Sequence, residues 1–424
     1  MKRILSSLLC GCMIMGLMAG CGQTTASSPA DNTEAKESGN DTVKNEDTTE
    51  IKIWHDGDEA IMGTIESDLN ETLKADNITV SFEKKSGLTD QLQLYGNDAA
   101  NGPDMYFYAH DSLGMLAEMG ILAPISDVTD VDALDTDLND MTVEATTYKE
   151  TQYMIPVYFE TLLFLYNKDL WEGEVPTTTD ELYDYMTAHT DTDAGTYAVV
   201  NQHSTAYNVA PVINGFGGYI IDKDGNPGLN AVETKEAISY NQKFAELQAD
   251  GDYNTVSTLF NEGNAAAIVG GPWLVSSIND AGINLGIKSL SEFTLPNGEA
   301  LAPYSGVQGV GVMKYAAESK KDAVEKVLKA IAGEEVGVDL AVNNNCAPAN
   351  EKAYENTEVA SNEMVQAIRK TADTAEPMPN IPQMSVMWGP TEEFLAAVNK
   401  SDADIDSAAE EYEQAAETAI SDMQ

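Results

Sequence analysis

Carboxylates dominate the side chains of this sequence that could carry chemistry. The chain has 70 Asp and Glu residues against 23 Lys and Arg and four His. Because acidic pairs occur throughout, spacing alone does not single out the two carboxylates of a glycosidase. His55, His110, His189 and His203 lie far apart and lack the spacing of zinc ligands. The sequence also has no HExxH motif, no GxSxG motif and no Gly-Lys dipeptide, so it offers neither a hydrolase signature nor a P-loop.

Tryptophans beside loop signals are the more informative group. Trp54 precedes a His-Asp-Gly-Asp run, Trp273 follows Gly-Gly-Pro, and Trp388 precedes Gly-Pro. Sugar rings have apolar faces and polar edges, so saccharide sites combine aromatic rings with carboxylates and amides. For these three tryptophans the sequence leaves two alternatives: they line a cleft, or they pack in the interior. For Trp171, after a predicted strand and turn, we expect packing.

The scarcity of arginine bears on the charge of a ligand. Beyond the first 20 residues the only arginine is Arg369. Arginine is the usual bidentate partner of carboxylate, sulfate and phosphate groups. The sequence therefore favours an uncharged ligand, and the net charge of −47 argues against nucleic acid.

One acidic segment resembles a calcium loop. Its candidate ligands fall at suitable spacing, but Pro227 stands where such a loop needs glycine for its sharp turn. A hairpin turn is the alternative, and both readings stay open for Asp222, Asp224, Asn226, Asn230 and Glu233.

The elements that must position these residues alternate between strands and helices. Residues 50–54, 77–82 and 104–108 read as strands. A capping box at Thr178 and Glu181 predicts a helix around 182–186, and a cap at Ser319 predicts a second helix that Gly333 ends. Helical spacing of apolar residues supports the second helix and a third, at Ala323, Val324, Val327, Leu328 and Ile331 and at Ala237, Tyr240, Phe244 and Leu247.

The N-terminal segment reads as an export signal followed by a tether. Residues 1–20 have a short basic start and an apolar run, and Cys21 follows in the pattern Met-Ala-Gly-Cys. We expect Cys21 to be acylated and residues 21–49 to form a disordered linker, since this stretch has almost nothing apolar to bury. The remaining residues, about 375, suit two α/β lobes. Cys346 is then the only other cysteine outside the signal, and we expect it to be buried.

Six blocks of the sequence, taken in order along the chain, carry a resemblance to a known family. They are IKIWHDGDEA (51–60), NGPDMYFYAHDSLG (101–114), GILAPI (120–125), PVYFETLLFLYNKDLW (156–171), FNEGNAAAIVGGPWLVSSIN (260–279) and PNIPQMSVMW (379–388). Together they resemble the maltodextrin-binding proteins, the extracellular solute-binding components of ABC sugar importers. The resemblance implies a two-lobe periplasmic-binding-protein-like fold of α/β class, with three chain crossings between the lobes and a ligand cleft between them. The expected lobes are 50–157 with 306–352, and 158–305 with 353–424.

Carried over residue by residue, the resemblance implies a ligand site. Trp54, Asp56 and Asp58 match the first ligand loop, while Tyr108 replaces a stacking tryptophan. The other expected contacts are Asp111, Glu160, Tyr207, Trp273, Met384 and Trp388. No cofactor, no metal and no catalytic residue is implied.

Four positions depart from the family pattern and remove charged groups that would bind sugar hydroxyls. They are Glu59, Ser112, Thr205 and Glu392. Because hydrogen bonds to charged groups contribute about 1.5–3 kcal/mol each, we expect weaker binding of a disaccharide and a preference for longer glucans.

The sequence thus predicts a monomeric, non-enzymatic lipoprotein on the outer face of the cell membrane. It would capture maltose or malto-oligosaccharides and deliver them to ABC permease subunits. The alternatives are a binding protein for another neutral oligosaccharide, a surface glycoside hydrolase, and a structural or adhesive lipoprotein.

Overall fold

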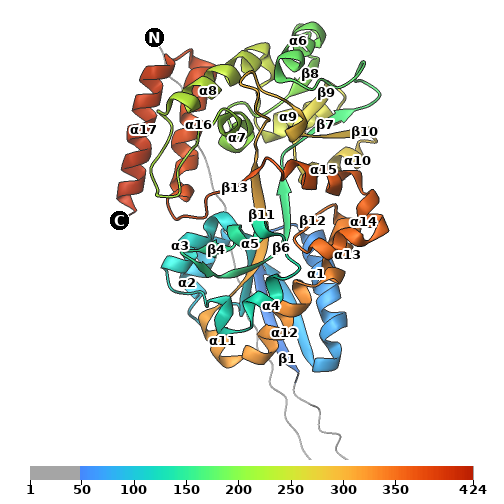
Figure 1. The fold of residues 1–424 in the computed structure, drawn as a ribbon, viewed down its shortest axis with the longest axis vertical. Helices are drawn as coiled ribbons and strands as arrows, with labels where there is room; N and C mark the ends of the chain where they lie inside the picture. The colour runs from blue at the N-terminus through green and yellow to red at the C-terminus, as the bar shows by residue number, and fades with distance from the viewer. Residues whose placement is uncertain (1–47, 424) are drawn as a thin grey trace, which may run out of the picture. The chain divides into compact units, whose positions relative to one another are not determined.

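Two β-sheets organise the chain, and helices pack against both of them (Figure 1). The computed structural model describes residues 48–423. The predicted signal, the predicted acylation at Cys21 and nearly all of the predicted linker lie outside the described residues. No helix within 48–423 combines the length and the apolar character needed to cross a membrane.

The first sheet contains all three strands predicted near the N-terminal end. β1 pairs in parallel with β2 and with β3, and β11 runs antiparallel between β3 and β6. The order is β12-β6-β11-β3-β1-β2, with β13 joined to the start of β11. The strands are β1 (Thr49–His55), β2 (Ile78–Lys84), β3 (Met105–Ala109), β6 (Met154–Thr161), β11 (Tyr304–Val312), β12 (Ala347–Pro348) and β13 (Glu376–Pro377).

Helices cover both faces of the first sheet because its strands carry apolar side chains on both faces. Ile51 and Ile53 of β1 pack in one core, whereas Trp54 packs in the other. On the first face lie α1 (Glu59–Thr72), α12 (Lys321–Ile331) and α13 (Glu334–Asn344), and on the second α2 (Leu88–Tyr95) and α3 (Leu113–Glu118). All five apolar positions predicted for the helix at 321–331 are buried.

The second sheet has the order β10-β7-β9-β8. Its strands are β7 (Leu163–Asn167), β8 (Tyr197–Val200), β9 (Ala265–Gly270) and β10 (Leu285–Ser289). The helices between and after them are α6 (Thr179–His189), α7 (Ala206–Gly215), α8 (Val232–Phe244), α9 (Tyr253–Asn261), α10 (Val275–Asp280) and α15 (Glu363–Thr371). Trp171 packs here as expected, 7% exposed and stacked on Tyr185 at a centroid distance of 4.2 Å.

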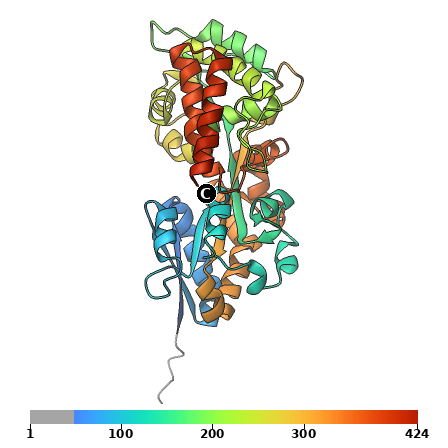
Figure 2. The same ribbon diagram turned by 90° about the vertical axis from the view of Figure 1, so that its left-hand side faces the viewer.

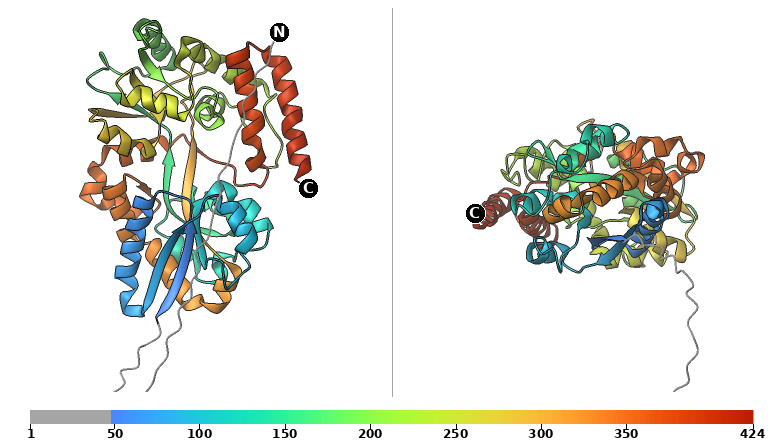
Figure 3. Two further views of the ribbon diagram at one scale, coloured as in Figure 1. Left: turned by 180° about the vertical axis from the view of Figure 1, so that it is seen from behind. Right: turned by 90° about the horizontal axis from the view of Figure 1, so that it is seen from below.

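The chain passes between the two sheets after β6, β10 and β12, and it then returns at β13 to the start of β11. β6 leads into β7 through Leu162, β10 is followed by β11, and β12 is followed by α15, which packs against β10. β6 and β11 are the long central strands of Figure 1 and appear from behind in Figure 3. β6 continues past the expected boundary at 157/158 to Thr161 and pairs with β11 along this length.

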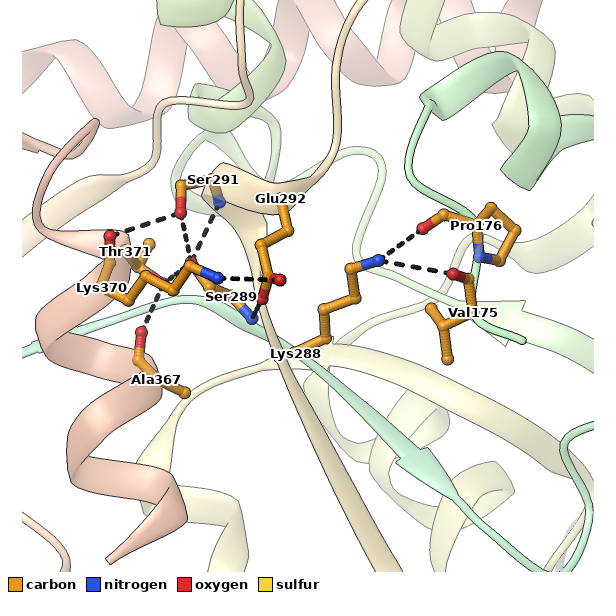
Figure 4. Close-up of polar contacts among 9 residues, drawn as sticks. All are labelled: Val175, Pro176, Lys288, Ser289, Ser291, Glu292, Ala367, Lys370 and Thr371. Carbon is orange, nitrogen blue, oxygen red and sulfur yellow. Dashed lines mark hydrogen bonds and ion pairs between the residues drawn. The ribbon is translucent and has the colours of Figure 1, made fainter. Parts of the chain in front are cut away.

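A polar network fastens α15 to the second sheet (Figure 4). The Ser289 hydroxyl lies 2.7 Å from the Thr371 hydroxyl, and Lys370 pairs with Glu292 at 2.8 Å. On the other side of the strand, Lys288 Nζ donates to the Pro176 carbonyl at 2.7 Å. The segment after β12 is thereby held to the second sheet.

Two long helices end the fold and lie side by side, as Figure 2 shows. They are α16 (Met384–Ser401) and α17 (Ile405–Asp422), and both pack with α7 and α8 in one core. The smaller elements are the hairpin β4 (Thr147–Tyr148) and β5 (Thr151–Gln152), and the helices α4 (Val131–Asp135), α5 (Asp140–Ala145), α11 (Lys314–Ser319) and α14 (Thr357–Ser361).

Two local predictions need correction. Ser319 does not cap the helix at 321–331; it ends α11, and its hydroxyl donates back to the Tyr315 carbonyl at 2.7 Å. The capping box at α6 is only half formed: Thr178 accepts from the Glu181 amide, but the Glu181 carboxylate accepts from Thr177.

The segment that resembles a calcium loop forms a hairpin turn. Asp222 N–H donates to the Asn226 carbonyl at 3.0 Å, and Ile221 pairs with Pro227. The Asp222 carboxylate accepts from the amides of Asp224 and Asn226, so the turn itself uses its oxygens. Among residues 48–423, no cluster of three or more His, Cys, Asp or Glu residues is arranged to hold a metal ion.

Candidate ligand-binding cleft

A pocket of about 360 Å³ lies where β6 and β11 meet α7 and α16. This volume is at the lower end of the range for ligand pockets, about 300–1,000 Å³. Its lining combines three aromatic rings, three carboxylates, one amide and three small or apolar residues; it consists of Ala109, Asp111, Glu160, Tyr207, Trp273, Gly306, Gln308, Met378, Trp388 and Glu392.

The sheet register places the polar floor of the pocket. Gly306 of β11 is directly opposite Glu160 of β6. One pleat further along, Gln308 points to the same face, and its Nε2 donates to Glu160 Oε1 at 3.3 Å. Burial raises the pKa of Glu160 to about 7, against which the Gln308 hydrogen bond acts only in part. Burial has removed water from the Glu160 carboxylate, and hydrogen bonds from a ligand could replace that water.

The end of β3 places the second carboxylate. The strand ends at Ala109, and a single 3₁₀ turn, η2 (His110–Ser112), follows it. Asp111 on this turn faces the pocket, while the neighbouring His110 is fully buried beneath it. Burial raises the pKa of the Asp111 carboxyl and lowers the pKa of the His110 ring.

Helices and the loop after β9 supply the aromatic wall. Tyr207 lies in the first turn of α7, and its ring centroid is 6.3 Å from that of Trp273 at an interplanar angle of 52°. Trp273 follows Gly-Gly-Pro at the end of β9 and remains 41% exposed. Trp388 lies in α16 and meets Tyr304 edge-on at 6.5 Å. These rings could cover the apolar faces of a flat ligand.

Five of the ten expected ligand residues thus line the pocket, namely Asp111, Glu160, Tyr207, Trp273 and Trp388. The other five lie elsewhere. Trp54 is 3% exposed, its Nε1–H donates to Glu83 at 3.0 Å, and Lys85 lies over its ring at 4.5 Å. Its donor and ring face are already used within the protein.

Asp56 and Tyr108 lie beside the pocket rather than in its lining. Burial raises the pKa of Asp56 and of Tyr108. Each of the two groups also affects the titration of the other, and the charge of Asp111 raises the pKa of both. Asp58 instead caps α1, its Oδ1 accepting from the Ala60 amide at 2.8 Å.

Met384 is fully buried at the start of α16 and packs in the core under that helix. It therefore supports the helix that carries Trp388 and does not face the pocket.

Ala109, Gly306, Gln308, Met378 and Glu392 line the pocket but were not expected as contacts. Gln308 is the lone amide side chain in an otherwise apolar and small-residue strand, which is a signal that sequence reading could have used. Gly306 and Ala109 carry no such signal. Met378 stands one residue before the block that begins at Pro379.

Of the four positions that depart from the family pattern, only Glu392 reaches the pocket. Glu59 lies in the first turn of α1, and Thr205 precedes α7. Ser112 is buried, and its hydroxyl donates to the Ala109 carbonyl at 3.1 Å. The pocket lining has no Lys, Arg, His, Ser or Cys. Its chemistry is hydrogen bonding by carboxylate and amide groups, together with ring stacking.

Comparisons with known proteins agree on one family. The family described as bacterial extracellular solute-binding protein matches residues 57–338. A maltotriose-binding protein of Pyrococcus abyssi is 30% identical over 373 residues, covering 86% of this chain and 81% of that protein. A galactooligosaccharide-binding protein of Bacillus subtilis is 28% identical, covering 99% and 96%.

A maltooligosaccharide ABC transporter solute-binding lipoprotein of Streptococcus pneumoniae is 29% identical, covering 89% of this chain and 88% of that protein. Among solved structures, a cyclo/maltodextrin-binding protein complexed with maltotetraose superposes with a TM-score of 0.78. It is 24% identical, and the match covers 90% of this chain and 98% of that one. The two-lobe fold is therefore shared.

Proposed function

The chain belongs to the bacterial extracellular solute-binding proteins, and from this we propose that its cleft captures malto-oligosaccharides for an ABC importer. The observation that carries the proposal is the pocket that joins Tyr207, Trp273 and Trp388 to the carboxylates of Asp111 and Glu160. The names of the relatives from Pyrococcus abyssi and Streptococcus pneumoniae support the α-glucan ligand.

In the proposed complex, the rings cover the apolar faces of glucose units. Asp111 and Glu160 accept hydrogen bonds from hydroxyl groups, and Gln308 both donates and accepts. Because Trp273 is partly exposed at the pocket, it is suited to a sugar unit that extends beyond the buried one. Contacts from both lobes stabilise the closed form, which the permease subunits then recognise. The ligand leaves unchanged, since the role we propose is capture and not catalysis.

The test is a glycan panel read by thermal shift and calorimetry. Maltotriose and maltotetraose should raise the melting temperature, because a ligand that binds only the folded state stabilises it by mass action. Chromatography of the incubated sugars should show them intact; shortened chains would favour a glycoside hydrolase. A panel in which no sugar shifts the melting temperature would overturn the proposal.

A galacto-oligosaccharide is the second candidate ligand. It is favoured by the relative from Bacillus subtilis, whose match covers 99% of this chain. The same panel separates the candidates: tighter binding of a galactose-containing trisaccharide than of maltotriose would select the second.

We also propose that Cys21 anchors the protein at the outer face of the membrane, as one monomer per tether. The lipoprotein name of the pneumococcal relative supports this. The Cys21→Ser chain should appear in the medium of an expressing bacterium, while the unchanged chain stays with the membrane fraction. Equal partitioning of both chains would count against the anchor.

A further inference from the structure

His110 is a buried histidine whose two ring nitrogens are both engaged. The Val307 N–H donates to Nδ1 at 3.0 Å, and Nε2 lies 2.9 Å from the Met378 carbonyl. A backbone N–H can only donate, so Nδ1 must accept and the proton must sit on Nε2, which donates to Met378. Burial lowers the pKa of the ring, and this favours the same neutral form.

The two partners of His110 come from distant parts of the chain. Val307 lies in β11, and Met378 lies just after β13. The residues next to His110 and Val307 in sequence, together with Met378 itself, make up half of the pocket lining: Ala109, Asp111, Gly306, Gln308 and Met378. One imidazole thus joins three of the segments from which the pocket is built.

The two bonds differ in how many other contacts hold the residue at their far end, Val307 or Met378. Val307 is aligned with Phe159 inside the β11–β6 ladder, so the sheet holds it without His110. Met378 lies beyond the two paired residues of β13, and its N–H bond to the Ser305 carbonyl is long, at 3.3 Å. The bond from Nε2 is therefore the shorter of two that fix Met378.

Met378 also begins the segment that leads to α16 and Trp388. Two residues on, the Asn380 carbonyl accepts from Gly114 N–H at 2.8 Å. The Asn380 amide donates to the carbonyls of Ala145 and Thr147 at 2.9 and 2.8 Å. His110 and Asn380 together attach the entry of α16 to the first lobe.

We propose that His110 is a positioning residue of the ligand pocket, and that its Nε2–H fixes Met378 and the segment that carries α16 to the cleft. The proposal rests on the sugar-binding function, but it assigns a role that touches no ligand atom. It distinguishes the two bonds: the one to Met378 serves binding, and the one to Val307 serves stability.

Two conservative variants separate these bonds. His110→Gln places an amide nitrogen near Nε2 and can keep the Met378 bond, while His110→Asn places its amide near Nδ1 and can keep the Val307 bond. Both lose one buried hydrogen bond, so both should melt at a lower temperature. With maltotriose as the probe, we expect Kd within about threefold of the wild type for His110→Gln but about tenfold weaker for His110→Asn.

A merely structural role would lower the melting temperature of both variants and leave Kd unchanged, or weaken both equally; either result overturns the proposal. The matched control is His203→Asn, because His203 is a second buried histidine, bonded to Asn241 at 2.7 Å and outside the pocket lining. It should lower the melting temperature and leave Kd as in the wild type.

If His110→Asn does not fold, Asn380→Ala takes its place, because it removes two other attachments of the same segment. A Kd equal to that of the wild type for Asn380→Ala would then overturn the proposal. Wild-type protein that binds no sugar on the panel would instead refute the proposed function, so the two failures are distinguishable.

Discussion

At the scale of single residues, the pocket is acidic and aromatic and lacks a basic counterpart. Asp111, Glu160 and Glu392 line it, while the single arginine of the described chain, Arg369, pairs with Glu351 at 2.7 Å. The pocket lining therefore offers no basic side chain to pair with an anionic ligand. The pKa of Glu160 is the clearest electrostatic sign of the site, and it leads to a pH prediction.

Binding of maltotriose should release a proton near neutral pH. In the ligand-free protein, burial holds the pKa of Glu160 at about 7. A sugar hydroxyl that donates to the carboxylate favours the charged form and lowers this pKa, so affinity should rise as the pH rises through about 7, by up to about tenfold for each unit of pKa displaced. Calorimetry in two buffers of different ionisation enthalpy measures the proton. Binding enthalpies that do not depend on the buffer would contradict the prediction.

The same carboxyl should make the ligand-free protein less stable at higher pH. Its folded-state pKa is raised above the ordinary value of 4.5, so its stabilising contribution is complete below that pH and is lost as the pH rises through about 7. Glu160→Gln should flatten this part of the plot of melting temperature against pH. Asp111 is present in both proteins, so the difference between the curves isolates Glu160. Parallel curves would show that Glu160 does not titrate there.

Trp273→Ala should weaken maltotriose binding with little loss of stability. The ring is partly exposed and contacts Tyr207, so its removal costs stacking of about 0.5–1.5 kcal/mol beyond buried area, or about two- to tenfold in Kd. Trp171→Ala is the control, because Trp171 is buried against Tyr185 and lies outside the pocket lining. The control should lower the melting temperature and leave Kd alone. A lower melting temperature and an unchanged Kd for Trp273→Ala would show that Trp273 does not contact the ligand.

At the scale of elements, the sequence predicted what depends on local pattern and missed what depends on register. Strands β1, β2 and β3 and the buried face of α12 follow from alternation and helical spacing. The hydrogen bonds of Trp54 and Asp58 do not follow from these patterns: the indole N–H donates to Glu83 of the neighbouring strand, and the Asp58 carboxylate accepts from the N-terminus of α1. Likewise, only the β6–β11 register shows that Gly306 is part of the pocket floor.

Gly306→Ala tests this floor. A Cβ at Gly306 would lie 3.7 Å from Glu160 Cγ and 3.8 Å from Met378 Cε, which is ordinary contact. The fold should therefore tolerate the methyl group, while the pocket becomes narrower and binds maltotriose more weakly. Gly311→Ala in the same strand is the control, because its Cβ would come within 2.2 Å of the Tyr106 ring. It should lower the melting temperature without narrowing the pocket. Unchanged Kd for Gly306→Ala would place the ligand elsewhere.

At the scale of the whole molecule, two sheets joined by several chain crossings create a site from residues far apart in the sequence. Asp111 and Trp388 line one pocket although most of the chain separates them. Length and the alternation of strand and helix patterns were enough to predict two α/β lobes, but which side chains meet depends on how the lobes are packed. One property does follow from composition alone, and it is the excess of negative charge.

The net charge of −47 predicts that salt stabilises the fold. Two electrostatic effects oppose each other: salt weakens the surface ion pairs, such as Lys352–Asp137 at 2.7 Å, but it also screens repulsion among the excess carboxylates. Exposed pairs contribute only about 0–1 kcal/mol each, and the pair Lys320–Asp104, whose carboxylate is buried, is screened by salt the least. Repulsion should therefore prevail, because it acts over the whole molecule.

Raising NaCl from about 0.01 M to about 0.15 M shortens the Debye length from about 30 Å to about 8 Å, so the melting temperature should rise across this range. Glycerol at equal osmolality controls for effects that do not involve charge, and a melting temperature that falls with salt would show that the ion pairs prevail.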